Sequence, residues 1–251
     1  MKGFVLRLLP AGASALAFMA MTSQASADAA GDKVLASMDT ALNRWKTQHL
    51  KYDVTNQEPG KAERKLELEV KLKGEKRLTE FLAPADMKGT KVLILSSTQM
   101  YVYLPAFGKV RRIASSVTDQ GFMGLTFTQT DLSLTRYSPE YTANVASESG
   151  DSWKIVATPK AGKEPPYAKI EFTVSKQSSL PTELRYFNAA GTHIKTETRS
   201  GYTCESDACT PSEMKMVDHT KGGHWTKLTR KAWKVNDSIA DEVFSKRSLE
   251  K

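Results

Sequence analysis

The residue types best suited to metal binding, redox chemistry or nucleophilic catalysis are sparse in this chain of 251 residues. Its only cysteines, Cys204 and Cys209, lie close together in a polar stretch, Cys204-Glu-Ser-Asp-Ala-Cys209. This spacing predicts a disulfide that closes a hairpin or loop in an oxidising compartment. A metal site would need further ligands, and the four histidines do not cluster with the cysteines at a recognised spacing.

Familiar catalytic motifs are also absent from the sequence. It contains no Gly-x-Ser-x-Gly elbow, no His-Glu-x-x-His pair and no glycine-rich phosphate loop. His219 and His224 flank Gly222-Gly223, so we expect them to face each other across a hairpin as a surface pair and not as metal ligands. A triad assembled from distant residues stays open, because triads are defined by geometry and not by chain order. We nevertheless predict no enzymatic activity, no metal and no cofactor.

Residues 1–27 have the layout of a cleavable secretory signal. Two basic residues near the start precede a mostly apolar stretch over 8–21, and the small-residue triplet Ala25-Ser-Ala27 follows. The alternative, a membrane anchor, is less favoured because the stretch contains proline and glycine and is shorter than the roughly 20 apolar residues that span a bilayer. We predict cleavage after Ala27 and a periplasmic protein. No cysteine follows the cleavage point, so no lipid anchor is expected.

The remaining residues, 28–251, are predicted to form a single domain. The formal net charge of the whole chain is +8, and the leader contributes two of the basic residues. This modest excess is compatible with an anionic membrane surface or an acidic partner, but a solvated basic surface explains it as well. No dense basic stripe is present, so we expect no nucleic acid partner.

Hydrophobic periodicity predicts a mostly β protein. Apolar residues recur at steps of three and four from Ala29 to about Lys51, which indicates one amphipathic helix. The pattern then changes to alternation, as in Leu66, Leu68, Val70 and Leu72, which places one apolar face on a strand. Further strands are expected near 76–82, 90–96, 99–104, 109–114, 140–147, 152–158, 167–174, 182–188, 192–199, 213–219 and 224–234.

Short turns between these strands require antiparallel neighbours. A single large curved antiparallel sheet must close or cover its apolar face, and short helices near 119–132 and 239–249 are the remaining elements that could do so. We therefore predict a half-open, incomplete β-barrel with a few helices as a lid. Its concave apolar face would suit an acyl chain, although an ordinary filled core gives the same pattern.

The segment over 81–132 carries a resemblance to a known family. Its pieces are Phe81-Leu-x-Pro84, Lys88-Gly89-Thr90, Met100-Tyr-Val-Tyr-Leu-Pro105, Lys109-Val-Arg-Arg-Ile113, Phe122-Met-Gly124 and Asp131-Leu132. In this order and spacing they resemble the outer-membrane lipoprotein-sorting proteins of the LolA/LolB type, in particular the branch often associated with transporters of the resistance-nodulation-division type. One departure is visible: Thr126 stands where an acidic residue is expected two positions after Gly124.

The resemblance implies a half-barrel that carries acylated cargo across the periplasm. We expect the apolar side chains of Leu68, Val70, Phe81, Leu93, Leu95, Val102 and Phe127 to line the lipid-binding cavity, with Phe122 and Met123 at its mouth. These assignments depend on register, because a shift by one residue moves a side chain to the other face. Arg111 and Arg112 are candidates for contact with an anionic head group or a partner, though solvated cations at a hairpin base fit equally well.

The leading hypothesis is a soluble, monomeric carrier that exchanges a lipid or acylated lipoprotein between membranes or with a membrane transporter. The alternative is a ligand-sensing or interaction module on the same fold that regulates a membrane partner. The absence of a cysteine at the cleavage point favours a diffusing carrier over an anchored receiver. The identity of the cargo and the direction of transfer do not follow from the sequence.

Overall fold

Strands dominate the computed structural model, which describes residues 22–114 and 122–250. The strands are β1 (Thr47–Gln57), β2 (Arg64–Lys73), β3 (Lys76–Ala83), β4 (Lys91–Ser96), β5 (Gln99–Leu104), β6 (Lys109–Arg112), β7 (Tyr141–Ser149), β8 (Ser152–Pro159), β9 (Lys169–Ser175), β10 (Pro181–Phe187), β11 (His193–Ser200), β12 (Thr203–Glu205), β13 (Ala208–Thr210), β14 (Glu213–Asp218) and β15 (His224–Val235). The helical segments are α1 (Thr22–Leu42), η1 (Pro105–Phe107), η3 (Phe122–Gly124), α2 (Gln129–Ser133), η4 (His219–Lys221), η5 (Asp241–Phe244) and α3 (Lys246–Leu249). Every strand predicted from the alternating pattern is present.

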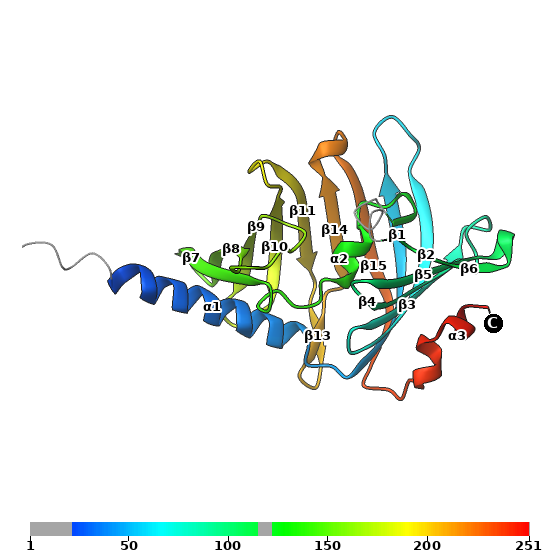
Figure 1. Cartoon of the computed structure of the whole chain (residues 1–251), viewed down its shortest axis with the longest axis horizontal. Coiled ribbons are helices and arrows are strands. Elements are labelled where there is room, and N and C mark those ends of the chain that lie inside the picture. The colour runs from blue at the N-terminus through cyan, green and yellow to red at the C-terminus, as the bar shows by residue number, and fades with distance from the viewer. Residues whose placement is uncertain (1–21, 115–121, 251) are drawn as a thin grey trace, which may run out of the picture.

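Thirteen of the described strands form one antiparallel sheet in the order β6-β5-β4-β3-β2-β1-β15-β14-β11-β10-β9-β8-β7. The chain enters this sheet in the middle with β1 and adds neighbouring strands outward to the edge strand β6. It then re-enters the sheet at the opposite edge with β7. Later strands return to the middle, where β15 pairs with β1. The edge strands β6 and β7 are not paired with each other, so the sheet curves without closing (Figure 1). The predicted half-open barrel is confirmed.

A long connection crosses the sheet because β6 and β7 lie at its opposite edges. We call residues 122–140 the crossing segment; it contains η3 and α2 and lies over the concave face (Figure 1). Its side chains Leu125, Phe127 and Tyr137 are buried in the main hydrophobic core. This segment provides the cover expected from a helix near 119–132, although only the short α2 is regular and residues 119–121 lie outside the described residues.

The N-terminal helix is shorter than predicted at its C-terminal end. Val34, Leu35 and Met38 are buried as the helical spacing indicates, but α1 ends at Leu42 and not near Lys51. From Thr47 onward the chain is β1, in which buried residues alternate with less buried ones. The predicted helix is too long because Trp45 continues the apolar spacing of the helix. In the structure the indole N–H of Trp45 donates to the carbonyl of Leu42 at 2.8 Å and closes the turn after the helix.

The helix α1 packs along β7 and covers that edge of the sheet (Figure 1). Gly31 makes this approach close enough that a Cβ there would lie 2.1 Å from the carbonyl oxygen of Ala143. The neighbouring Asp32 accepts hydrogen bonds from the Ala143 N–H at 2.7 Å and the Thr142 hydroxyl at 2.8 Å. An exposed row of strand N–H groups is a site for unwanted pairing, and α1 covers part of it here. The helix begins at Thr22, while residues 1–21 of the predicted leader lie outside the described residues, so its cleavage stays a prediction.

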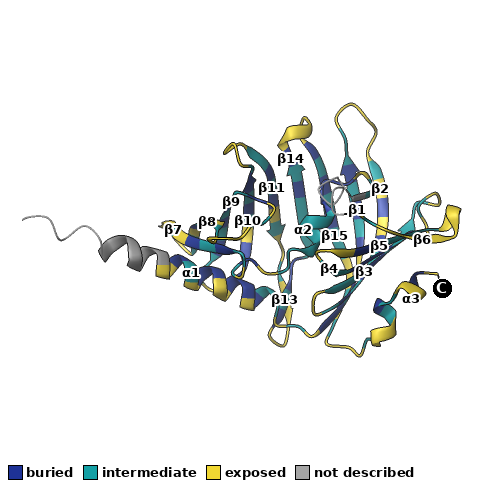
Figure 2. Ribbon diagram, in the orientation of Figure 1, coloured by how far each residue is buried: buried dark blue, intermediate teal, exposed yellow. Residues whose placement is uncertain are grey.

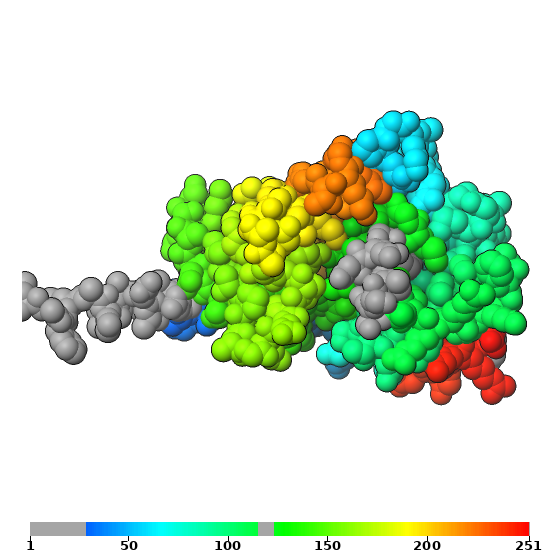
Figure 3. Space-filling model, turned by 45° about the horizontal axis from the view of Figure 1, so that its top comes forward, coloured from blue at the N-terminus to red at the C-terminus, as the bar shows by residue number. Residues whose placement is uncertain are grey.

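The two faces of the sheet carry separate hydrophobic clusters. On β2 the predicted residues Leu66, Leu68, Val70 and Leu72 are all buried on the concave side, and buried residues alternate with less buried ones along the strands (Figure 2). On the opposite face the described C-terminal residues, which are red in Figure 3, pack against β3, β4 and β5. That smaller cluster contains Leu78, Leu93, Tyr101, Phe244 and Leu249. The helical end predicted near 239–249 is therefore present as η5 and α3.

A short hairpin, β12 and β13, lies outside the large sheet and contains the two cysteines. Cys204 and Cys209 are paired across it and joined by a disulfide, so that prediction is confirmed. None of the helices in the part of the chain described here is long and apolar enough to cross a membrane.

Candidate functional site

A cavity of about 200 Å³ lies between the concave face of the sheet and the crossing segment. Its floor comes from alternate positions of the central strands, because every second side chain of a strand points to the same face. Its cover comes from the crossing segment and from the end of α1. The apolar lining consists of Leu42, Trp45, Leu50, Leu68, Val70, Leu72, Leu125, Phe127, Leu132, Leu134, Met214 and Leu228.

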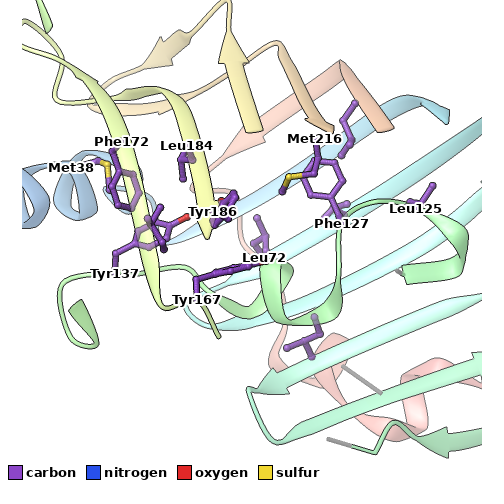
Figure 4. Packing of buried hydrophobic residues seen from close by; sticks show 14 of the residues in the cluster. Met38, Leu72, Leu125, Phe127, Tyr137, Tyr167, Phe172, Leu184, Tyr186 and Met216 are labelled. Carbon is purple, nitrogen blue, oxygen red and sulfur yellow. The ribbon is translucent and has the colours of Figure 1, made fainter. Parts of the chain in front are cut away.

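Aromatic and aliphatic side chains from the crossing segment interlock with the sheet around this cavity. Figure 4 shows Phe127 beside Met216 and Tyr137 beside Phe172. The rings of Tyr137 and Phe172 meet edge to face, with centroids 4.9 Å apart. Such contacts hold the crossing segment on the sheet largely through burial of apolar surface.

Three of the predicted cavity residues line this cavity: Leu68, Val70 and Phe127. Phe81 and Val102 lie on the same face of the sheet and pack in or against the main core, but they are not part of the lining. Whether any of these side chains contacts a lipid stays a prediction.

Leu93 and Leu95 were placed on the wrong face of β4. Leu93 is buried in the cluster beneath the C-terminal helices, and Leu95 packs against the same cluster. Val92 and Ile94 face the main core in their place. The strand is apolar on both faces, so alternation alone does not tell which set of residues faces the cavity.

The predicted mouth residues lie in η3, at the start of the crossing segment. Met123 is partly buried against the main core and has a positive φ of 52°. Its carbonyl accepts a hydrogen bond from the Arg64 guanidinium at 2.7 Å. The side chain of Phe122 lies outside the described residues. A role for either residue at a cavity mouth stays a prediction.

Arg111 and Arg112 are exposed on the edge strand β6, away from the cavity lining. The Arg111 guanidinium lies over the exposed ring of Phe107, 5.3 Å from its centroid. Arg112 donates a hydrogen bond to the carbonyl of Thr98 at 3.0 Å. Neither residue lines the cavity. Contact of either one with an anionic head group or a partner stays a prediction.

The two histidines expected to face each other do not do so. The His219 ring lies against that of His193, with centroids 4.5 Å apart, and the cross-strand partner of His224 is Asp218. The ring of His224 turns inward to Asn56, at 3.0 Å. Among the described residues, no group of three or more His, Cys, Asp or Glu side chains is arranged to hold a metal ion.

A buried ion pair fastens the crossing segment to the sheet, and sequence reasoning missed it. Asp131 on α2 accepts a hydrogen bond from the Lys195 ammonium of β11 at 2.7 Å, and the two side chains are only 4% and 9% exposed. The hydroxyl of Tyr167 also donates to Asp131. Burial, and then the charge of Asp131, raise the pKa of Tyr167 far above its usual value, so the hydroxyl stays protonated and available as a donor.

Asp131 also starts α2. Its carboxylate accepts from the N–H of Thr128 at 2.8 Å, while the Thr128 hydroxyl accepts from the N–H of Asp131 at 3.1 Å. This reciprocal capping satisfies two N–H groups that the first turn of a helix leaves without partners. The same carboxylate thus sets the local conformation of the crossing segment and its attachment to β11.

Thr126 provides a second anchor at the position where the family resemblance leads one to expect a carboxylate. It is buried; its hydroxyl donates to the carbonyl of Met216 at 3.1 Å, and its N–H donates to the Thr226 hydroxyl at 2.9 Å. A third anchor is Asp39 on α1, which accepts from the N–H groups of Tyr137 and Ser138 at 3.0 and 2.7 Å. The crossing segment is therefore fixed by polar contacts along its length.

Glu197 and Arg199 on β11 form a second buried ion pair, with 2.7 Å between the Glu197 carboxylate and the Arg199 Nε. Both residues line the cavity. Burial alone would lower the pKa of Arg199, but the adjacent Glu197 carboxylate raises it overall, so the guanidinium stays charged. Glu197 also accepts from the Tyr186 hydroxyl at 2.8 Å. Burial raises the pKa of the neighbouring Tyr137 to about 12, so this tyrosine is neutral near pH 7.

One further cation, Arg77 on β3, lines the cavity without an ion pair among the described residues. Its Nε is buried and has no hydrogen-bond partner. Burial lowers the pKa of Arg77, and the nearby Tyr52 hydroxyl partly offsets this effect. The cavity is thus apolar over most of its lining, with two balanced ion pairs on one wall and an unbalanced guanidinium on another.

The chain is similar to several known proteins. A family model described as "Uncharacterized protein" matches residues 73–251. No curated protein matches the chain. Among solved structures, a domain from Vibrio parahaemolyticus named for outer membrane lipoprotein sorting is 23% identical, with a TM-score of 0.81 over 89% of this chain and 100% of the other.

Two further solved structures have the same fold. A DUF1329 family protein from Desulfovibrio piger is 24% identical, with a TM-score of 0.79 over 89% of this chain and 99% of the other. A LolA superfamily protein from Nitrosomonas europaea is 18% identical, with a TM-score of 0.71 over 87% of this chain and 98% of the other. At these identities the likenesses establish the fold, and they confirm that it is LolA-like.

Proposed function

Since the chain belongs to the family described as "Uncharacterized protein", whose model covers residues 73–251, and has a LolA-like fold, we propose that it is a carrier of acyl chains. It binds the acyl part of a lipid or lipoprotein in the cavity beneath the crossing segment and works in the periplasm as a monomer. The observation that carries the proposal is the cavity itself, which has a mostly apolar lining on the concave face.

The driving force for such binding is removal of the chain from water. Each buried methylene group contributes roughly 0.8 kcal/mol, so a long acyl chain does not leave a membrane at useful rates without a protein that covers it. A cavity on a curved sheet can cover such a chain on several sides. Release then requires that the acceptor, a second membrane or a membrane transporter, bind the chain more favourably.

The size of the cavity implies that binding is accompanied by movement. Its volume of about 200 Å³ is below the range of roughly 300–1,000 Å³ that is usual for pockets of drug-sized ligands. A long chain therefore needs the crossing segment to move away from the sheet. Buried side chains such as Phe127 and Tyr137, hydrogen bonds and one ion pair hold that segment, and all of these contacts can be exchanged without breaking the strand ladder beneath.

The partner side of the proposal rests on the family resemblance and on the basic edge of the sheet. The resemblance to proteins associated with resistance-nodulation-division transporters makes such a transporter a candidate donor or acceptor. Arg111 and Arg112 on β6 are exposed and lie away from the cavity, so a partner can reach them while the cavity is occupied.

Transfer between vesicles tests this function. Donor vesicles contain a phospholipid with a fluorescent acyl chain, and we expect transfer to acceptor vesicles to increase with protein concentration. Val70→Trp fills the cavity and is expected to abolish the increase, whereas Val156→Trp on the outer face of β8 keeps it. Transfer by Val70→Trp at the rate of the unmodified protein would contradict the proposal. Binding of the fluorescent lipid without transfer would instead favour a sensing role.

A further inference from the structure

Arg77 occupies an unusual position for a charged side chain. In the register of the sheet it lies opposite Leu72 on β2 and Ile94 on β4, so it projects from the concave, apolar face. It lines the cavity, and no hydrogen bond or ion pair joins its guanidinium to another described residue. The residue is half-buried, and its Nε is buried without a partner. A polar atom that loses water without gaining a partner is unfavourable.

The other charges of the cavity lining are balanced within the protein. Asp131 is paired with Lys195, and Glu197 is paired with Arg199. Arg77 therefore leaves the cavity with an excess of one positive charge. A neutral ligand would leave this charge uncompensated, whereas an anionic ligand would supply the missing partner.

Hydroxyl groups add polar donors to the lining of the same cavity. Tyr52 lies close enough to Arg77 for the guanidinium to lower the pKa of the phenol against the larger effect of burial. Tyr52, Thr79 and Thr210 also line the cavity. Hydroxyl donors next to a guanidinium are a suitable set for the oxygens of a carboxylate or a phosphate.

The register of β2 and β3 gives the direction in which an acyl chain would lie. Arg77 pairs with Leu72, Thr79 with Val70 and Phe81 with Leu68, so along this pair of strands the side chains become apolar toward Phe81. On the next strand, β1, Tyr52 lies beside Leu68. At about 3.3 Å per residue this stretch of β3 spans roughly 13 Å. An amphiphile with its head at Arg77 would thus have its tail over Val70 and Leu68.

We propose that Arg77 binds the anionic group, a carboxylate or a phosphate, of the amphiphile whose acyl chain occupies the cavity. This inference rests on the proposed carrier function and narrows its ligand to an anionic amphiphile. Arg77 is thereby a specificity residue inside the cavity, distinct from the exposed arginines of β6. Because its charge is unpaired, its loss does not remove an internal contact that the fold needs.

The test measures the affinity of the full protein for dodecanoate, dodecyl phosphate and the neutral dodecanol by calorimetric titration. Three variants are compared with the unmodified protein: Arg77→Met, Arg77→Lys and the control Lys154→Met, which removes an exposed cation on the outer face of β8. A charged hydrogen bond contributes about 1.5–3 kcal/mol, so Arg77→Met should weaken binding of both anions about ten- to a hundredfold. Dodecanol binding should change less than about twofold, and Arg77→Lys should restore part of the loss.

The outcomes separate the two proposals. Equal affinity of Arg77→Met and Lys154→Met for dodecanoate would overturn the role of Arg77 while leaving the carrier function intact. Loss of dodecanol binding together with a lower melting temperature in Arg77→Met would identify a structural residue and also overturn it. Inorganic phosphate that binds as tightly as dodecyl phosphate would show a site for a free anion instead. Failure of all three amphiphiles to bind the unmodified protein would overturn both proposals.

Discussion

The buried pair of Asp131 and Lys195 gives the strongest prediction for a single substitution. Asp131→Ala removes the acceptor of three donors: the Lys195 ammonium at 2.7 Å, the Tyr167 hydroxyl, and the Thr128 N–H at 2.8 Å. Lys195 is only 9% exposed at its side chain, so its charge would be left without a partner and largely without water. Breaking a buried pair in this way lowers the free energy of unfolding by roughly 3–5 kcal/mol.

A double-mutant cycle separates the ion pair from the other contacts of Asp131. Lys195→Met alone leaves a buried carboxylate, whereas Asp131→Ala with Lys195→Met leaves no charge at this place. The double variant should therefore lose less stability than the sum of the two single variants, with a coupling energy of about 0.5–3 kcal/mol. Urea unfolding near pH 7, followed by circular dichroism and tryptophan fluorescence, gives each free energy.

A surface pair serves as the matched control. Glu213 and Lys227 approach to 3.6 Å, and their side chains are 44% and 37% exposed. Because water screens such a pair, Glu213→Ala should change the free energy of unfolding by less than about 1 kcal/mol. If Asp131→Ala had an effect as small as this control, or if the two single losses simply added, the ion pair would not be what fastens the crossing segment to the sheet.

Three other changes are expected to have smaller effects. Thr126→Val removes the hydroxyl that donates to Met216 and should lower the free energy of unfolding by about 1 kcal/mol; an unchanged urea midpoint would contradict this. Reduction of the disulfide between Cys204 and Cys209 should lower stability by about 2 kcal/mol, because the loop that it closes is short; equal melting temperatures with and without reductant would argue against it. Burial lowers the pKa of His224 below its usual 6.5, so the unfolded chain binds the proton more readily. Its contribution to stability is therefore full above about pH 6.5 and declines as the pH falls, and His224→Gln should make urea midpoints less dependent on pH between pH 7 and 5.

Much of the fold followed from the sequence because most strands have one strongly apolar face. On β2, Leu66, Leu68, Val70 and Leu72 alternate with charged residues. This alternation indicates a half-buried strand and also which of its faces is buried. On β1 the alternation of apolar and polar residues is less regular. Trp45 extends the apolar spacing of α1, and Asn56 occupies a buried position near the end of the strand. The strand was therefore hidden within the predicted helix and the residues after it.

The candidate site was harder to predict because it depends on side chains that are distant in sequence. Leu93 and Leu95 were assigned to the wrong face since β4 is apolar on both sides, and only the packing of the C-terminal helices distinguishes the two. Asp131 and Lys195 are 64 positions apart and meet only because the crossing segment passes over β11. Arg77 has no sequence signal of its own; the register that places it opposite Leu72 is what brings it to the concave face.

The central claim is that the cavity beneath the crossing segment holds an acyl chain in the living cell. Native mass spectrometry of protein purified from cells of its own host, followed by lipid extraction, tests it most directly. We predict one acyl-bearing molecule per chain on the unmodified protein and on Val156→Trp, and none on Val70→Trp. Unmodified protein that carries no lipid, or lipid bound equally to Val70→Trp, would contradict the claim.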